Sequence, residues 1–158
     1  MVKKAVLILF VFNFMVACEQ DLQQPLFQYV LDNPVASGTR YPNLYKDNTG
    51  VLYMSWLSPI EEDIMALEYS TYSEGRWTAP ETVHIDTDFF ENWADFPSVV
   101  GYDGVELAAH RLKKIEGGPY AYNVLVSFYN QQTGRWNEPI TVHQDDTATE
   151  HGLSLIHI

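Results

Sequence analysis

The chain has 158 residues, and its 21 Asp and Glu against 9 Lys and Arg give a formal net charge of −12. A chain of this length usually forms one domain, and its acidity argues against a nucleic-acid partner, because affinity for phosphate depends on clustered Lys and Arg. Aromatic residues make up 14% of the chain and there is one cysteine, which excludes a disordered chain and a disulfide-stapled miniprotein.

The N-terminus has the pattern of an export signal. Two lysines precede an apolar run over residues 5–12, which is too short to span a bilayer. The run continues to Met15-Val16-Ala17-Cys18, which resembles the lipobox of bacterial lipoproteins. We therefore expect a signal peptide over 1–17, lipid attachment at Cys18 and a tether over 18–39. The protein would then be anchored to a membrane outside the cytoplasm, on an outer-membrane, periplasmic or cell-surface face. A transmembrane anchor, or an ordinary signal peptide with a chance cysteine, is the alternative.

An internal repeat is the strongest feature of the rest of the chain. The ten residues from Gly75 to His84 recur 59 residues later, with seven of ten positions identical. Upstream, Tyr-Pro-Asn-Leu at 41–44 matches Phe-Pro-Ser-Val at 96–99. The second copy carries extra residues, which we assign to a longer hairpin around 113–119. Chance is a poor explanation for two separate matches in the same order.

Each repeat is predicted to form four short strands. Residues 124–129 alternate with the period of two that is typical of a strand, and 51–57 and 65–72 occupy the equivalent places in the first repeat. Turn signals stand at 47–50 and 73–75. We detect no long helical stripe.

Repeats of this size, with four strands and a recurring Trp, are typical of β-propeller blades. The sequence therefore predicts an all-β fold, a partial β-propeller with blade-like repeats at 40–95 and 96–152. Two hairpin pairs of a β-sandwich are the alternative.

Two turns and one strand entry resemble a known family. Residues 70–77 and 130–136 resemble degenerate Asp-boxes, the S-x-D-x-G-x-x-W turns of bacterial sialidases, with Tyr72 where the family has Asp. Arg40-Tyr41-Pro42 resembles the R-I-P element of sialidase catalytic domains. Further segments resemble sialidase-like lipoproteins of Bacteroidetes, namely 92–98, 108–110, 120–122 and 149–152. The resemblance implies a six-bladed sialidase-like (BNR, Asp-box) propeller, of which this chain would carry about two blades.

The resemblance also implies roles for individual residues. Arg40 would bind the sialate carboxylate, which a bidentate guanidinium suits better than a lysine does. Asp63, between the second and third strands of the first blade, would be the acid/base group. The other arginines, the Tyr nucleophile and its Glu partner would lie in later blades, so we expect this chain alone to be inactive. Arg40 as a surface residue and 61–63 as a solvated loop are the alternatives.

The second repeat holds two further candidates. Asp95 and His110 are a titratable pair, and the sequence match places Arg40 and Trp56 opposite them in the first repeat. Perturbed titratable pairs are common at functional sites, although structural ion pairs look the same in a sequence.

Three aromatic residues are candidates for sugar stacking in a non-catalytic propeller: Trp93, Tyr120 and Tyr122. The repeated Trp77 and Trp136 are instead interpreted as packing residues. We interpret the acidic residues at 86–88 as a solvated loop rather than a calcium site.

Two functions remain open. The chain is either part of a lipid-anchored, sialidase-like glycoside hydrolase acting on terminal sugars, or a non-catalytic glycan- or protein-binding propeller lipoprotein associated with polysaccharide utilisation. There is no paired-Cys or H-E-x-x-H zinc pattern and no phosphate-binding Gly loop, so we expect no metal and no cofactor. The expected partners are a glycan or glycoconjugate and a membrane through Cys18, without nucleic acid and without an obligate oligomer.

The last six residues, 153–158, interrupt a polar acidic stretch. Their back-translation resembles a transposon end used in sequencing libraries, so we expect the native reading frame to continue beyond Gly152. An ordinary apolar terminal strand is the alternative. Two blades cannot close a ring, and we expect such a chain to expose sheet faces and strand edges that favour aggregation.

Overall fold

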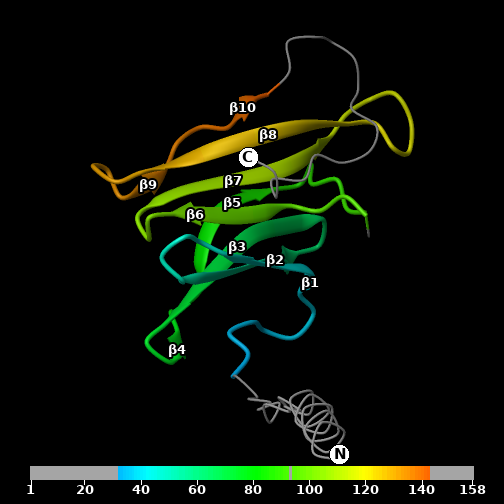
Figure 1. Ribbon diagram of the computed structural model, residues 1–158. Coiled ribbons are helices and arrows are strands. Elements are labelled where there is room, and N and C mark those ends of the chain that lie inside the picture. The colour runs from blue at the N-terminus through cyan, green and yellow to red at the C-terminus, as the bar shows by residue number, and fades with distance from the viewer. Residues whose placement is uncertain (1–31, 93, 143–158) are drawn as a thin grey trace, which may run out of the picture. The chain divides into compact units, whose positions relative to one another are not determined.

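The computed structural model describes residues 32–92 and 94–142, which form two antiparallel β-sheets (Figure 1). The first sheet contains β1 (Arg40–Lys46), β2 (Leu52–Glu61), β3 (Ile64–Ser73), β4 (Arg76–Trp77) and β5 (Glu81–Asp86). The second contains β6 (Ser98–Tyr102), β7 (Glu106–Lys114), β8 (Tyr122–Asn130), β9 (Arg135–Trp136) and β10 (Ile140–Thr141).

The all-β prediction is confirmed for this part of the chain, in which no helix occurs and hence none that could cross a membrane. The predicted signal peptide, Cys18, Trp93 and the segment from residue 143 onward lie outside the described residues.

The two sheets have the same topology. In the first, β1, β2 and β3 pair in order, and β4 and β5 both pair with β3 as two halves of a split outer strand. In the second, β6, β7 and β8 pair in order, and β9 and β10 both pair with β8. The predicted four-stranded repeat is thus present twice.

The connections agree with the turn signals in the sequence. Glu74 and Gly75 join β3 to β4, both with positive φ, and Gly50 lies with φ 95° in the turn between β1 and β2. The connection between β7 and β8 spans residues 115–121, where the first sheet has only Glu62 and Asp63. This is the longer hairpin that the extra residues predict.

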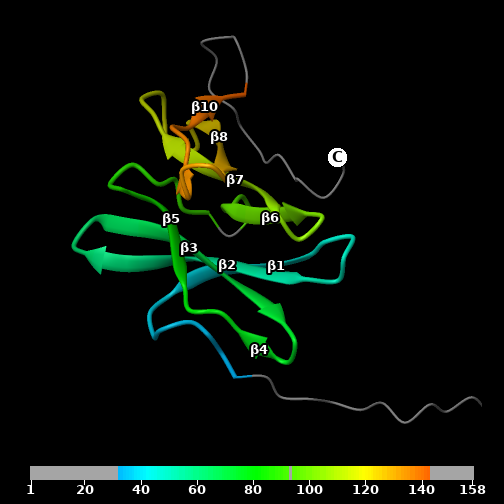
Figure 2. The same cartoon turned by 90° about the vertical axis from the view of Figure 1, so that its left-hand side faces the viewer.

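The core lies between the sheets, which stack face to face (Figure 2). From the first sheet, β2 and β3 contribute Tyr53, Leu57, Met65, Leu67 and Tyr69, and Val99 and Ala109 come from the second sheet. The Tyr53 ring lies against the backbone of Gly101 so closely that a Cβ there would be 2.2 Å from the ring Cζ. The Val99 amide donates a hydrogen bond to Ser55 Oγ at 3.2 Å. Close backbone approach therefore fixes how the two sheets meet.

The strand registers correct one part of the repeat match. Tyr72 and Tyr129 both pair with the repeated Trp, so they are equivalent positions in β3 and β8. Three residues before these tyrosines, Tyr69 of β3 pairs with Ser55 of β2, and its equivalent Val126 of β8 pairs with His110 of β7. His110 is therefore equivalent to Ser55, and Trp56 is equivalent to Arg111. The expectation that His110 matches Trp56 is wrong by one residue.

This correction decides which faces of the sheets meet. Successive side chains of a strand point to opposite faces. In the first sheet, the side chains that face the second sheet include Tyr53, Ser55 and Leu57. Their equivalents in the second sheet, Ala108, His110 and Leu112, point away from the first sheet, because Ala109 and Arg111 between them face it. We call the Tyr53 face of the first sheet, and the equivalent Ala108 face of the second, the front faces. The front of the first sheet thus packs on the back of the second.

A carboxylate clamp joins the turns at one end of the two sheets. Asp47 is buried, and its Oδ1 accepts hydrogen bonds from the amides of Thr49 and Val51, both at 2.9 Å. Its Oδ2 accepts from the Gly104 amide in the β6–β7 turn at 2.9 Å. Burial alone would raise the pKa of Asp47, but these donors outweigh it and hold the pKa below its usual value. The clamp therefore requires the ionised carboxylate.

A buried arginine connects β7 with the end of the first sheet. The Arg111 side chain is buried, and it forms ion pairs with Asp88 at 2.7 Å and Asp86 at 3.5 Å. Its guanidinium also lies 5.5 Å from the centre of the Phe89 ring. The prediction of a solvated loop at 86–88 is therefore wrong, because two of its carboxylates are the partners of a buried cation.

Candidate functional site

A cavity of about 720 Å³ opens at the end of the first sheet where β1 begins and β2 turns into β3. The connection that follows β5 and the last residue of β7 complete its wall. Its charged residues are Arg40, Glu61, Glu62, Asp63, Glu91 and Lys114, and its other walls come from Pro59, Met65, Thr87 and Phe89. The volume lies within the range of small-molecule binding sites.

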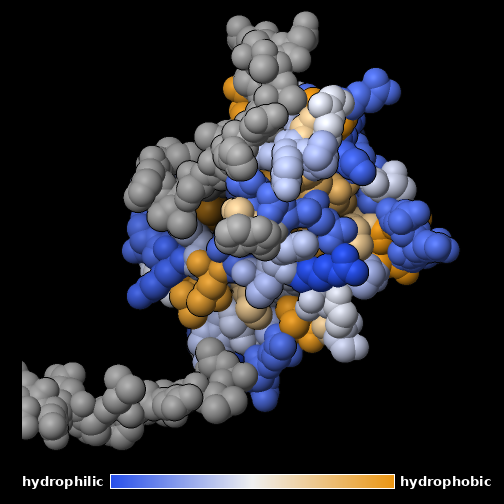
Figure 3. Space-filling view, turned by 90° about the vertical axis from the view of Figure 1, so that its right-hand side faces the viewer, coloured by the Kyte–Doolittle hydropathy of each residue, from blue (hydrophilic) through white to orange (hydrophobic). Residues whose placement is uncertain are grey.

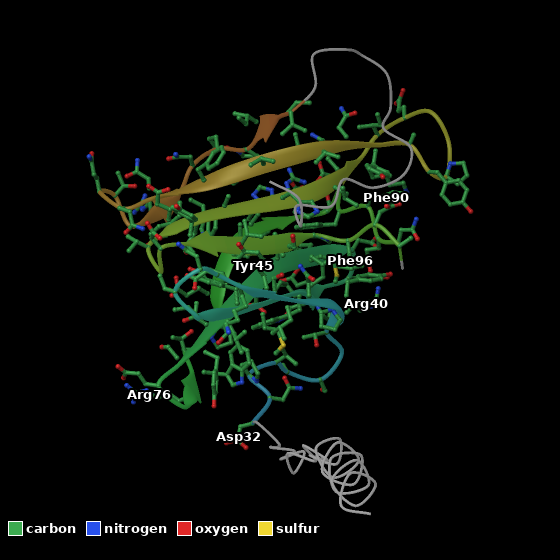
Figure 4. The ribbon with its side chains drawn as sticks, in the orientation of Figure 1. Asp32, Arg40, Tyr45, Arg76, Phe90 and Phe96 are labelled. Carbon is green, nitrogen blue, oxygen red and sulfur yellow. The ribbon has the colours of Figure 1, made fainter. Side chains whose placement is uncertain are left out.

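Arg40 reaches this cavity from a distorted strand entry. The β1–β2 ladder shifts register between Arg40 and Asn43, and Tyr41 within this bulge has φ 54°. A left-handed backbone is costly for a bulky residue, and such strain is concentrated at functional sites. Bulges of this kind redirect neighbouring side chains. Figure 4 shows Arg40 at the same end of the sheets as Phe96, and Arg76 at the opposite end.

Asp63 comes from the tight turn between β2 and β3. Its φ of 62° is left-handed, which aspartate tolerates better than most residues. Because β1 begins beside the end of β2, this turn and Arg40 line the same cavity. The two residues that the sialidase resemblance singles out are therefore neighbours of one site.

The cavity is acidic, and Arg40 already forms an ion pair within it. Four carboxylates face two cations, and Arg40 donates from Nη1 to Glu91 Oε2 at 2.8 Å. This hydrogen bond and the charge of Glu91 raise the pKa of Arg40. The Arg40 side chain remains 56% exposed, so an incoming ligand can reach it. Figure 3 views the molecule from the side on which Arg40 lies in Figure 4, and much of that face is hydrophilic, with separate hydrophobic patches.

Asp95 and His110 do not line this cavity. His110 is buried on β7, with Nδ1 3.0 Å from Ser98 Oγ. Burial lowers its pKa to about 4, against the opposing effect of a hydrogen bond with the Phe96 backbone, so the imidazole is neutral at pH 7. Asp95 is also buried and accepts a hydrogen bond from Asn92 at 3.4 Å. A catalytic role for these two residues stays a prediction.

The aromatic candidates differ in exposure. Tyr120 is 59% exposed in the 115–121 connection, as stacking on a sugar requires. The predicted stacking role of Tyr122 is wrong, because its side chain is 1% exposed and its ring packs 4.5 Å from that of Phe90. Trp93 lies outside the described residues. Trp136 packs edge-on against Tyr69 at 5.9 Å, in agreement with the predicted packing role.

Sequence reasoning missed Glu91 and Lys114. Both reach the cavity from parts of the chain that the repeat pattern treats as connections, and neither belongs to a motif. Lys114 could have been found from the length of the hairpin it precedes, which places it at the end of β7. Glu91 carries no such signal.

Within residues 32–92 and 94–142, no group of three or more His, Cys, Asp or Glu side chains could hold a metal ion. Comparisons with protein-family models, with curated proteins and with solved structures found no match to the chain. The functional argument therefore rests on the residues of the cavity.

Proposed function

We propose that the cavity binds the terminal sugar of a glycan and that the chain is part of a sialidase-like glycoside hydrolase. The observation that supports this proposal is that Arg40 and Asp63, which the sequence resemblance singles out separately, line one cavity of ligand-binding size. In this proposal the two sheets are the first blades of a propeller, and later blades supply the remaining catalytic groups.

The roles follow from the chemistry of the two side chains. The Arg40 guanidinium would bind the carboxylate of an acidic sugar, which would replace Glu91 as the acceptor of its hydrogen bonds. The Asp63 carboxyl group would protonate the oxygen of the leaving sugar. The excess of carboxylates around Arg40 opposes an anionic ligand at long range, so binding has to depend on short contacts with the guanidinium.

The second candidate is a non-catalytic glycan-binding propeller. One observation in its favour is that Arg40 already forms an ion pair with Glu91. The other is the exposed Tyr120, which lies in the connection that follows Lys114, a residue of the cavity wall. An exposed ring of this kind can stack on a neutral sugar, which needs no arginine.

Binding of 3′-sialyllactose and of lactose to the full chain, measured by calorimetry, distinguishes the two candidates. The hydrolase proposal predicts preference for the sialylated sugar, and at least about tenfold weaker binding by Arg40→Ala, because a charge-assisted hydrogen bond is lost. Arg76→Ala, at the other end of the first sheet, is the matched control. Equal affinity for both sugars, with loss of binding in Tyr120→Ala only, would favour the binding protein.

Catalysis needs a separate test, because the chain alone is expected to be inactive. Turnover of a fluorogenic sialoside by a longer product of the same reading frame, abolished in Asp63→Asn while sialoside binding persists, would support the acid/base role. Full activity of Asp63→Asn would rule that role out.

We also propose that Cys18 carries a lipid, on the lipobox pattern of residues 15–18. Metabolic labelling with a radioactive fatty acid in a bacterial host should mark the wild-type chain and leave Cys18→Ser unlabelled. Equal labelling of both would contradict the proposal.

A further inference from the structure

An apolar patch lies on the front face of the second sheet. Val100, Ala108 and Phe128 form one cross-strand row, and Val126 and Ile140 lie in the next row. A groove of about 300 Å³ borders the Val100 row, with Tyr45 of β1 also in its wall. Of the five patch residues, Phe128 and Ile140 are 51% and 56% exposed and the others are half-buried. We call these five residues the front patch. Exposed apolar residues gathered on one sheet face mark an interaction surface.

A second apolar patch lies on the back face of the first sheet. Leu44 and Met54 are register partners in one row, and Leu52, Tyr72 and Trp77 lie in the next. Leu44 is 59% exposed, and the other four are half-buried. We call these five residues the back patch.

Every residue of the back patch has an equivalent on the back of the second sheet. These pairs are Leu44 with Val99, Leu52 with Leu107, Met54 with Ala109, Tyr72 with Tyr129 and Trp77 with Trp136. In the second sheet these equivalents are covered: Val99 and Ala109 belong to the core, and Leu107 and Trp136 pack against it. The back patch thus repeats a surface that the chain already uses to pack one sheet on another.

The front patch likewise repeats the surface that receives this packing. Val126 is equivalent to Tyr69, against which Trp136 packs, and Ala108 is equivalent to the core residue Tyr53. We infer that, where no further sheet covers the front patch, the back patch of one copy of the chain stacks on the front patch of a second copy, head to tail. The contact between two copies would resemble the contact between the two sheets within one copy over these patches only, because Trp56, next to Met54 on the back face of the first sheet, is 1% exposed and already covered.

Charges at the edges of the patches agree with this arrangement. Lys46 is equivalent to Gly101, which lies against Tyr53 within one copy. Because Ala108 is the equivalent of Tyr53, stacking brings Lys46 of one copy to Ala108 of the next. Glu106 lies two residues before Ala108 on the same face of β7. A lysine on one copy therefore approaches a glutamate on the other. Because the two patches differ, the contact is heterologous, and a copy bound on one side keeps a free patch on its other side.

Sedimentation velocity of the full 158-residue chain over a range of concentrations tests the inference. The wild-type chain should associate as concentration rises. Phe128→Asp removes the front patch and Leu44→Asp removes the back patch, and each should weaken association at least about tenfold, because a charge is buried without a partner. Val105→Asp, which alters an exposed apolar residue in the β6–β7 turn, is the control and should associate as the wild type does. Circular dichroism would establish that all variants are folded.

Mixing the two patch variants is the decisive step. The intact front patch of Leu44→Asp can receive the intact back patch of Phe128→Asp, so an equimolar mixture should form a dimer that grows no further. Association of Leu44→Asp alone at the wild-type level would show a front-to-front contact and overturn the inference. A wild-type chain that stays monomeric at all concentrations would also overturn it, and would leave the front patch to a further sheet of a longer chain.

Discussion

The two sheets share one topology and one sequence repeat, yet equivalent positions have opposite environments. Val99 in β6 is 1% exposed, whereas its equivalent Leu44 in β1 is 59% exposed. Both repeated tryptophans pack on a tyrosine of their own sheet, Trp77 on Tyr72 at 5.1 Å and Trp136 on Tyr129 at 5.5 Å, but Trp136 also packs on Tyr69 across the sheet interface. The difference comes from the neighbour of each sheet and not from the repeat itself.

The comparison also shows where the repeat has diverged. Trp56 is equivalent to the buried Arg111, Ser55 to the buried His110, and Lys46 to Gly101. In each case the second sheet has a residue whose role depends on its particular neighbours. Substitutions at these three positions therefore test the correspondence more sharply than substitutions of the shared apolar residues.

The largest effect is expected at Arg111. Arg111→Ala removes a buried, well-packed cation from its ion pairs with the half-buried carboxylates Asp86 and Asp88, and we expect a loss of about 3–5 kcal/mol in the free energy of unfolding. Urea denaturation measures this loss. Arg135→Ala, in the exposed β9 strand, should change stability by less than about 0.5 kcal/mol. Equal effects of the two substitutions would show that the network around Arg111 is not structural.

A pH-dependent effect of intermediate size is expected at His110. Its pKa is about 4 in the folded state and 6.5 in the unfolded state, so the unfolded chain binds the extra proton between these values. The neutral imidazole therefore makes its full contribution to the free energy of unfolding above pH 6.5. This free energy decreases by about 3 kcal/mol as the pH falls from 6.5 toward 4. Urea midpoints measured from pH 7 to pH 4 should fall less steeply for His110→Gln than for the wild type. Parallel curves would refute the buried, neutral state of His110.

A smaller effect is expected at Gly101. Gly101→Ala places a methyl group 2.2 Å from Tyr53 Cζ and should cost about 2 kcal/mol, because the sheets must move apart. Lys46→Ala, at the equivalent exposed position, should be close to neutral. A double-mutant cycle with Tyr53→Leu should show coupling between Gly101 and Tyr53. Without such coupling, the stated contact between the sheets would be wrong.

Much of the fold could be predicted from the sequence because it rests on local patterns. The repeat of Gly75–His84, the alternation in 124–129 and the turn residues place the strands correctly, since turn chemistry and side-chain period act within a few residues. The match of His110 to Trp56 failed for a related reason. A shift of one residue reverses the face of every side chain in a strand, and a repeated turn cannot reveal such a shift.

The candidate site was predictable only in part. Arg40 and Asp63 lie at the same end of neighbouring strands, so the order of β1, β2 and β3 brings them together. Glu91 and Lys114 come from a connection and from the other sheet, and only three-dimensional packing places them there. Tyr122 illustrates the same limit, because strand alternation fixes its face and Phe90 decides that the face is covered.

The central claim is that Arg40 and Asp63 belong to one glycan-binding site. Amide hydrogen exchange of the full chain, measured with and without 3′-sialyllactose, tests it most directly. The account predicts slower exchange on binding at the start of β1, in the β2–β3 turn and near Glu91, and no change around the β3–β4 turn at the other end of the first sheet. Protection confined to the β3–β4 turn, or none at saturating ligand, would contradict it.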